Sequence, residues 1–137
     1  MPSETTIKGE LACLKFEQRA IEKGAIVSKP TLECEYDRIL DFEGKLYKVQ
    51  VKYSDSKPSQ AEGAVLAQIS KAGKKHGSHE SYSKEDIDVI VIYIPKVDKL
   101  CWIPFDVWNG KKSLQLRYSE AKNSQTKGVR MVADYVW

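Results

Sequence analysis

Three side chains that can bind a metal ion and act on a phosphate ester fall within one short segment of the chain. Asp37 lies in the first of two β-rich runs, and Gln50 and Lys52 lie in the second. The runs are separated by Glu43 and Gly44, which are typical of a tight turn. A hairpin with this two-residue loop places Asp37 directly opposite Gln50, with Lys52 one step along the same face. An acid, an amide oxygen and an ammonium group would then meet at one point.

The reaction that suits this set is phosphodiester hydrolysis. Magnesium prefers hard oxygen ligands and keeps several waters, so one or two carboxylates and a carbonyl are enough to hold it. The carboxylate of Asp37, the side-chain oxygen of Gln50 and the backbone carbonyl of Val51 give part of an octahedron. The ammonium of Lys52 can orient or deprotonate a water molecule, or stabilise the negative charge that develops on the phosphate. We therefore expect Mg²⁺ as the cofactor, with Mn²⁺ able to replace it.

The same residues also fit a ladder of charges on a purely structural hairpin. Glu33, Glu35 and Asp37 share a face with Lys48 and Lys52 across the turn. Opposite charges commonly pair across hairpin strands. Spacing alone favours the charge ladder, because such patterns are common on hairpins.

A resemblance to a known family favours the metal site. An aspartate and a Gln-x-Lys on a hairpin, preceded by a helix that begins with Gly9 and Glu10, resemble the PD-(D/E)XK nuclease superfamily in its Gln-x-Lys form. Further short motifs follow in matching order over nearly the whole chain. They resemble a subfamily of small endonucleases that includes a group I intron homing endonuclease, and they lie at residues 9–15, 24–30, 36–37, 49–53, 82, 86–88, 102–105, 114–117 and 121–125.

This resemblance implies an α+β fold with a restriction-endonuclease-like core, in which a mixed β-sheet carries an N-terminal helix. It also implies that Glu10, Asp37 and Lys52 are catalytic, and that Glu10 and Asp37 bind the metal beside Gln50. The alternative acid on the helix is Glu17, which lies on the same flank as Glu10. Gln50 stands where the superfamily usually has Asp or Glu, so the site carries one negative charge fewer.

The function implied by the resemblance is a magnesium-dependent, site-specific, double-strand DNA endonuclease of the homing type. A 137-residue domain cannot follow a long site alone, so we expect a homodimer or a homotetramer. A Holliday-junction resolvase would share the same catalytic residues and is the second enzymatic hypothesis. The non-enzymatic hypothesis is a DNA-binding module in which Gln50 marks a decayed metal site.

Charge is unevenly distributed along the chain, although the net charge is only +3. Residues 45–75 and 111–130 each carry a balance of +5, whereas residues 1–44 and 76–110 each carry −3. Basic stretches around an acidic metal site favour a DNA partner, although a solvated lysine-rich face gives the same pattern. The expected DNA contacts are Lys29, Lys57, Lys71, Lys74, Lys75, Lys111, Lys112 and Arg117.

Length and composition indicate a compact protein. With 137 residues and 42% hydrophobic content, we expect a single nuclease domain over residues 1–137. The cysteines Cys13, Cys34 and Cys101 show no metal-ligand spacing and are expected to be reduced thiols of a cytoplasmic protein. The N-terminus lacks the pattern of a signal peptide, and no apolar run approaches the length needed to cross a membrane, so we expect no membrane partner.

The expected order of elements is a helix followed mainly by strands. The helix should run from about residue 8 to 23, capped by Ser3 or Thr6 and ended by Gly24, with a strand over 24–30 and then the hairpin. Residues 61–72 fit a helix or a strand, and we favour extended structure. Residues 70–83 predict a mobile basic loop whose two histidines bind no metal, and residues 87–94 predict a strand covered on both faces. A turn into a further strand is expected over 97–105, and another strand over 113–119. Residues 120–128 predict a polar loop, and residues 129–137 predict a packed aromatic C-terminus.

Overall fold

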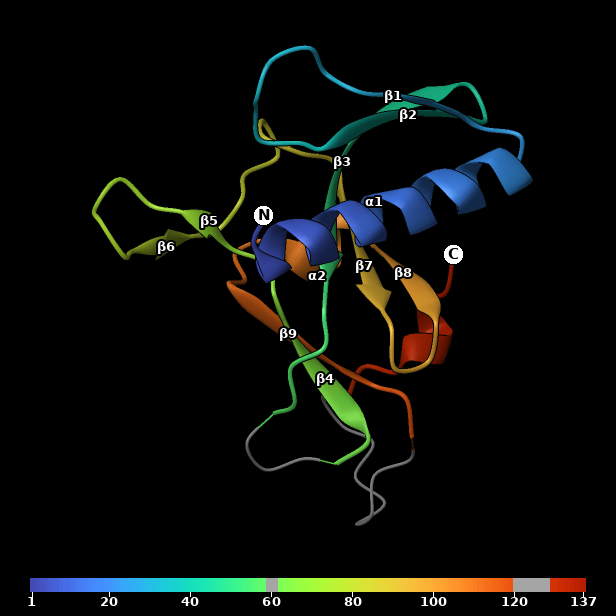
Figure 1. Ribbon diagram of the computed structural model, residues 1–137. Helices are drawn as coiled ribbons and strands as arrows, with labels where there is room; N and C mark the ends of the chain where they lie inside the picture. The colour runs from blue at the N-terminus through green and yellow to red at the C-terminus, as the bar shows by residue number, and fades with distance from the viewer. Residues whose placement is uncertain (59–61, 120–128) are drawn as a thin grey trace.

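A mixed five-stranded sheet with a long N-terminal helix across one face forms the centre of the molecule (Figure 1). The computed structural model describes residues 1–58, 62–119 and 129–137. Strands β3 and β7 are parallel, and the other neighbours in the sheet are antiparallel. This is the α+β arrangement expected from the sequence. In spatial order the strands are β1 (Ile26–Ser28), β2 (Arg38–Phe42), β3 (Lys45–Tyr53), β7 (Val89–Ile94) and β8 (Lys99–Ile103), and the helix is α1 (Glu4–Glu22).

The first helix begins earlier than the sequence predicted. Of the two candidate caps Ser3 is the one used, because its side-chain oxygen accepts a hydrogen bond of 3.2 Å from the backbone N–H of Thr6. The helix ends before Gly24, which has a φ of +77° that other residues rarely adopt. One stripe of α1 is buried against the sheet, and it consists of Ala12, Cys13, Phe16 and Ala20.

The hairpin of β2 and β3 has the predicted turn and register. Glu43 and Gly44 both have positive φ, 52° and 80°, as a two-residue hairpin loop of the primed type requires. The ladder runs from the pair Phe42–Lys45 to the pair Arg38–Val49. Alternate residues of β3 point to opposite faces, so the buried Val49 and Val51 pack beneath α1 while Gln50 and Lys52 lie on the other face.

Strand β7 is buried along its whole length, as its β-branched sequence predicted. Its second face is covered by an antiparallel pair, β4 (Ala64–Gln68) and β9 (Ser113–Arg117), which confirms extended structure for the first of these segments. A short helix, α2 (Phe105–Trp108), was not predicted. It follows Pro104 and buries Trp108 completely, and the indole nitrogen of Trp108 donates to the carbonyl of Asp88 at 3.2 Å.

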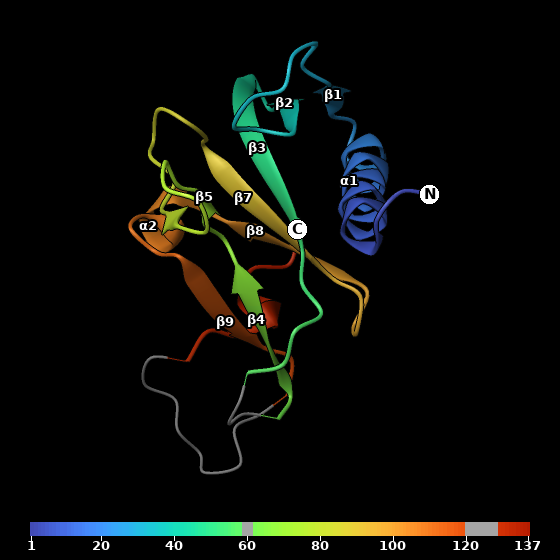
Figure 2. The same ribbon diagram turned by 60° about the vertical axis from the view of Figure 1, so that its left-hand side comes forward.

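The predicted basic loop contains a small hairpin. Strands β5 (Lys71–Ala72) and β6 (His79–Glu80) are antiparallel, and Figure 1 shows them extending away from the central sheet, whereas in Figure 2 they come toward the viewer. The backbone N–H of Gly73 donates to the carbonyl of Ser78 at 2.8 Å, so the chain turns back tightly. We call residues 71–80 the arm. Its glycines and lysines were visible in the sequence, but two strands of two residues are too short for a periodicity to indicate them.

The C-terminal aromatic residues pack on the core, as predicted. The ring of Trp137 stacks on Phe16 at a centroid distance of 5.3 Å and also contacts Phe42 and Trp102. Tyr135 follows the 3-10 helix η1 (Val132–Asp134). It packs against the hydrophobic cluster between β7 and the β4–β9 pair, which we call the second core. The predicted polar loop over 120–128 lies outside the described residues. None of the described helices is long and apolar enough to cross a membrane.

Candidate active site

Asp37 directly precedes β2 and is held against β3 by two hydrogen bonds. Its backbone N–H donates to the carbonyl of Val49 at 2.9 Å, and its Oδ2 accepts from the backbone N–H of Val51 at 2.9 Å. The β-ladder ends one pair before the predicted Asp37–Gln50 pair. The carboxylate therefore takes the place beside β3 that a main-chain carbonyl would occupy, and its position is fixed by the strand.

The side chain of Gln50 meets Asp37, as the predicted register required. In the amide orientation that satisfies both contacts, Nε2 donates to Asp37 Oδ2 at 3.2 Å and to the carbonyl of Glu35 at 2.8 Å. The atom of Gln50 that faces these two acceptors is therefore a nitrogen. In this orientation Oε1 faces away from these two acceptors.

Lys52 is half-buried on the same face of β3 as Gln50. Its Nζ donates a long hydrogen bond of 3.4 Å to the carbonyl of Ser70 and lies 5.5 Å from the centre of the Tyr82 ring. Burial lowers the pKa of the Lys52 ammonium, and the negative charge of Asp37 opposes this effect in part. A lysine with a lowered pKa exchanges a proton with water more readily than an exposed one.

The carboxyl group of Asp37 has a raised pKa. Burial is the main cause, because it disfavours the charged form, and the nearby charge of Glu10 acts in the same direction. The hydrogen bond from Val51 and the positive charges of Lys52 and Arg38 oppose the rise. The effect of Glu10 on Asp37 shows that the helix acid and the hairpin acid are electrostatic neighbours.

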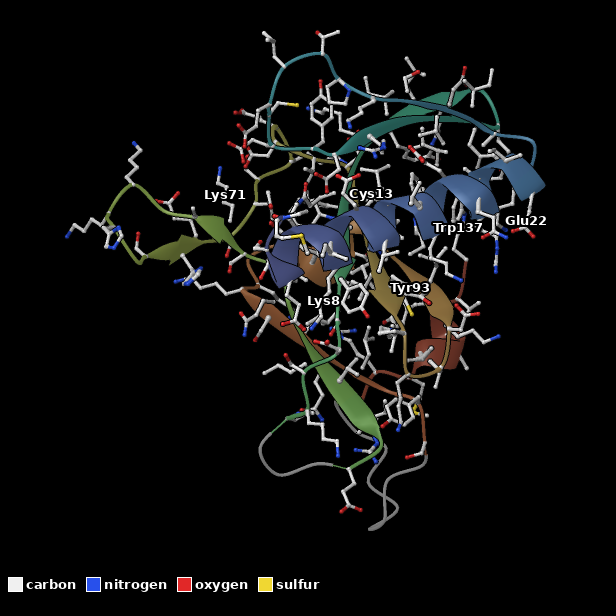
Figure 3. The ribbon with its side chains drawn as sticks, in the orientation of Figure 1. Lys8, Cys13, Glu22, Lys71, Tyr93 and Trp137 are labelled. Atoms are coloured by element: carbon white, nitrogen blue, oxygen red, sulfur yellow. The ribbon has the colours of Figure 1, made fainter. Side chains whose placement is uncertain are left out.

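One open cleft brings together all the residues predicted to be catalytic. It has a volume of about 530 Å³ and lies between the N-terminal half of α1 and β3, with Glu10, Asp37, Gln50 and Lys52 in its lining. The exposed carboxylate of Glu10 comes from the helix, and the other three groups come from the hairpin. Figure 3 marks Lys8 and Cys13 on α1, and both also line this cleft.

The donor set of the cleft fits a hard divalent cation. Two carboxylates, one amide oxygen and the carbonyl of Val51 are oxygen ligands of the kind that Mg²⁺ prefers. In the described part of the chain, no group of three or more His, Cys, Asp or Glu side chains is gathered into a metal site. The proposed ligand set has only two acids, Glu10 and Asp37, because Gln50 stands where an acid is usual, so it has fewer than three such side chains.

The alternative interpretations of the acids are resolved by their contacts. None of the ion pairs among residues 1–58, 62–119 and 129–137 joins Glu33, Glu35 or Asp37 to Lys48 or Lys52, so the charge ladder is not formed. The ammonium of Lys48 donates instead to the carbonyl of residue 85.

Glu17, the alternative helix acid, has a structural partner. It accepts a 2.8 Å bond from Nε of Arg38, a residue that is 5% exposed and whose guanidinium also donates to the carbonyl of Asp37 at 2.7 Å. Sequence reasoning missed Arg38. The signal was available, because Arg38 alternates with Leu40 and Phe42 and so lies on the core face of β2.

The residues predicted to contact DNA differ in accessibility. Lys71 is ion-paired with Asp86 at 2.9 Å, and Arg117 is 8% exposed and donates to the carbonyls of Glu62 and Ser119. The contacts of these two within the protein give each a structural role. The remaining six are exposed at the surface: Lys29, Lys57, Lys74, Lys75, Lys111 and Lys112.

The sequence analysis gave no role to two further residues near the predicted catalytic groups, although residue 82 is one of the positions that carry the family resemblance. Lys8 lies on the cleft wall and bonds Asp55 at 2.7 Å and Glu4 at 3.1 Å, and these contacts raise its pKa. Tyr82 is buried beside Lys52, and burial raises the pKa of its phenol to about 12. No spacing relates residue 82 to the hairpin, so only the fold reveals its proximity.

Comparisons with known proteins show the family of this chain. Residues 3–137 match the family described as PD-(D/E)XK endonuclease. The chain is similar to a solved structure of the bacterial homing endonuclease I-Ssp6803I, with 26% identity, a TM-score of 0.77, and coverage of 98% of this chain and 89% of the other. A weaker structural likeness is to MepB, with 15% identity, a TM-score of 0.46, and coverage of 92% and 87%. No curated protein sequence matches the chain.

Proposed function

The chain belongs to the PD-(D/E)XK endonuclease family and is therefore a DNA-cleaving hydrolase, and from this premise we propose that it is a magnesium-dependent, site-specific endonuclease of the homing type that cuts double-stranded DNA. The observation that carries the proposal is the convergence of Glu10, Asp37, Gln50 and Lys52 on one open cleft. The similarity to a bacterial homing endonuclease over 98% of the chain supports the homing type.

Divalent metals are generally used by this family, and the cleft offers suitable ligands. The carboxylates of Glu10 and Asp37, the side-chain oxygen of Gln50 and the carbonyl of Val51 would hold Mg²⁺, with Mn²⁺ able to replace it. The N–H and C=O of one strand residue point to the same side, so the Val51 carbonyl faces the edge where Asp37 lies. When bound, the cation neutralises phosphate charge and lowers the pKa of water.

Lys52 is the proposed acid–base or charge-stabilising group. Burial weakens its preference for the charged form, so it can accept a proton from the attacking water. As an ammonium it can instead donate to a phosphate oxygen as negative charge develops. Asp37 is held rigidly by the Val51 N–H, so the distance between the acid and the lysine is set by β3 rather than by a loop.

The DNA partner would be held by exposed lysines around the cleft. Lys29 lines a neighbouring hollow that also includes Glu10 and Asp37, whereas Lys74 and Lys75 lie on the arm. A single domain of this size contacts one half of a long site, so we propose a homodimer or homotetramer as the active species.

Plasmid cleavage tests the proposal. Purified protein should linearise a plasmid that carries its target in the presence of Mg²⁺ and should leave it intact in a chelator. Alanine at Glu10, Asp37 or Lys52 should each lower the cleavage rate at least about 100-fold, because an interaction made in the transition state is lost. The Lys52→Ala protein should still bind DNA. Lys45→Ala removes an exposed lysine from the same strand and should cut normally.

Two outcomes would favour the other hypotheses. Cleavage of four-way junctions in preference to linear duplexes would indicate a resolvase. Absence of any metal-dependent cleavage, or full activity in the Lys52→Ala protein, would overturn the catalytic assignment and favour a DNA-binding module.

A further inference from the structure

The catalytic lysine is surrounded by groups that the proposed reaction does not use. Its ammonium lies over the ring of Tyr82, with Nζ 5.5 Å from the ring centre, and donates to the carbonyl of Ser70 at 3.4 Å. Tyr82 is 6% exposed and belongs to the second core, which also contains Ile69 and Ile87. The ring is therefore fixed, while the lysine that it contacts has a long and flexible side chain.

The nature of these contacts leaves the ammonium able to act. In the described part of the chain, no carboxylate forms an ion pair with Lys52. A salt bridge would direct the N–H groups to one acid. An aromatic face attracts the cation through its quadrupole without accepting a strong hydrogen bond, so it holds the side chain and leaves its donors for water or phosphate.

The two segments that contact Lys52 are joined to each other. Ser70 directly precedes the arm, and Tyr82 lies two residues beyond its end. Next to them, Lys71 pairs with Asp86 at 2.9 Å, and the same Asp86 Oδ2 accepts from the backbone N–H of Ser83 at 2.9 Å. The side chains of the ion pair are only 23% and 18% exposed, so this link lies at the root of the arm rather than in open solvent.

We propose that Tyr82 and the Ser70 carbonyl form a cradle that positions the Lys52 ammonium for cleavage. Tyr82 is a positioning residue in this arrangement, because it acts through Lys52 and does not contact the substrate. The Lys71–Asp86 ion pair holds both sides of the cradle together at the root of the arm. The inference rests on the proposed catalytic role of Lys52, but the geometry of the cradle can be tested separately.

Nuclear magnetic resonance tests the geometry without any activity. Protons above an aromatic ring resonate upfield, so the ε-methylene signal of Lys52, assigned by its loss in Lys52→Arg, should be shifted upfield of the other lysines. Tyr82→Phe should keep the shift, whereas Tyr82→Leu should remove it. An unshifted wild-type signal, or an unchanged shift in Tyr82→Leu, would overturn the cradle even in a protein that cuts DNA.

Single-turnover cleavage at saturating protein tests the positioning role. Tyr82→Leu should lower the cleavage rate constant about 10- to 100-fold, as expected for a misplaced catalytic group, with the DNA dissociation constant changed less than about twofold. Tyr82→Phe should cut like the wild type. The matched control is Ile103→Ala, which truncates a fully buried side chain of the same core away from Lys52.

The outcomes separate the cradle from the proposed function. Equal losses of rate in Tyr82→Leu and Ile103→Ala would mean that Tyr82 acts only through stability, and the positioning role would be wrong. If the wild type cuts no DNA, the proposed function fails, while the Lys52 resonance still decides whether the cradle exists.

Discussion

The backbone N–H of Val51 donates a 2.9 Å hydrogen bond to Oδ2 of Asp37, so a carboxylate replaces a main-chain carbonyl at the edge of β3. This bond fixes the acid, but it does not fully compensate the burial that raises the pKa of Asp37. In the absence of a cation, the folded protein therefore carries a charge in a place that disfavours it. Such a buried charge lowers stability in the absence of a cation, as expected if the site binds the cation that we propose.

Removing this charge should stabilise the metal-free protein. Asn is close in shape to Asp and can still accept from Val51, so Asp37→Asn should have a higher Tm than the wild type in a chelator while losing cleavage. Added Mg²⁺ should raise the Tm of the wild type and not that of the variant, since a ligand stabilises only the state that binds it. Thermal unfolding by circular dichroism measures both effects.

The difference in Tm between Asp37→Asn and the wild type should depend on pH, because the pKa of Asp37 is raised in the folded protein. Above its raised pKa, folded Asp37 is charged, and the loss of stability from burying this charge is fully present. As the pH falls, the folded carboxyl is protonated before the unfolded one, whose pKa is 3.8, so this loss shrinks and disappears below that value. The Tm advantage of Asp37→Asn should thus be greatest at high pH and decline as the pH falls toward 4. A lower Tm for the variant at neutral pH would contradict this account.

Gln50 should be a working ligand that binds the cation through its side-chain oxygen. Its NH₂ contacts Asp37 Oδ2 and the Glu35 carbonyl in the metal-free protein, and both are acceptors. A carboxylate at this position would face them without a proton to share, so Gln50→Glu should lower the Tm in a chelator. The extra charge should also bind Mg²⁺ more tightly, so that divalent cations raise the Tm of the variant more than that of the wild type.

Calorimetry and cleavage complete the test of Gln50. In calorimetry, the wild type should bind Mg²⁺ weakly without DNA and more strongly with DNA. In the cleavage assay, Gln50→Ala should lose activity, and Gln50→Glu should stay partly active. Gln18→Glu makes the same change of charge on an exposed position of α1 and should alter neither Tm nor metal affinity. Tight Mg²⁺ binding to the free wild type, or normal cutting by Gln50→Ala, would mean that Gln50 is not a ligand.

Glu17 should matter for stability and not for chemistry. Its substitution by alanine leaves the buried guanidinium of Arg38 without its carboxylate, which should cost about 1–3 kcal/mol of unfolding free energy because Glu17 itself is partly exposed. Urea unfolding measures this loss. Glu22→Ala, which removes an exposed acid from the same helix, should cost less than about 0.5 kcal/mol.

A second measurement separates Glu17 from Glu10. Well below its Tm, the Glu17→Ala protein should retain most of its cleavage rate, whereas Glu10→Ala should retain its stability and lose cleavage. Abolished cleavage in a folded Glu17→Ala protein would move the helix ligand from Glu10 to Glu17.

The sequence revealed those parts of the site that depend on local periodicity. The turn at Glu43 and Gly44, together with alternation along β3, was enough to place Asp37 beside Gln50 and Lys52, because register in a two-residue hairpin is fixed by the turn. The helix acid required the family resemblance, since Glu10 and Glu17 lie on one flank of α1. Local patterns did not distinguish them.

Contacts between distant segments could not be predicted. Tyr82 meets Lys52 only because residues 70–83 fold back beside β3, and the Lys71–Asp86 pair depends on the same return of the chain. The DNA-binding prediction treated all basic residues alike, because net charge in a stretch does not show which side chains are already paired. Lys71 and Arg117 are engaged within the protein, whereas Lys74 and Lys75 are exposed.

The exposed lysines of the arm should contribute to DNA affinity through phosphate contacts. Each phosphate neutralised on duplex DNA adds roughly −0.9 to the slope of log affinity against log salt. Substituting Lys74 and Lys75 together by Gln should therefore make the slope shallower by up to about 1.8 and weaken binding at low salt. Fluorescence anisotropy with a labelled target duplex between about 50 and 200 mM salt measures the slope. The matched control is Lys96→Gln with Lys99→Gln, which removes the same charge from the β7–β8 turn and from the first residue of β8, and it should leave the slope unchanged. Equal slopes for the arm variant and the wild type would mean that Lys74 and Lys75 are ordinary solvated lysines that do not contact DNA phosphates.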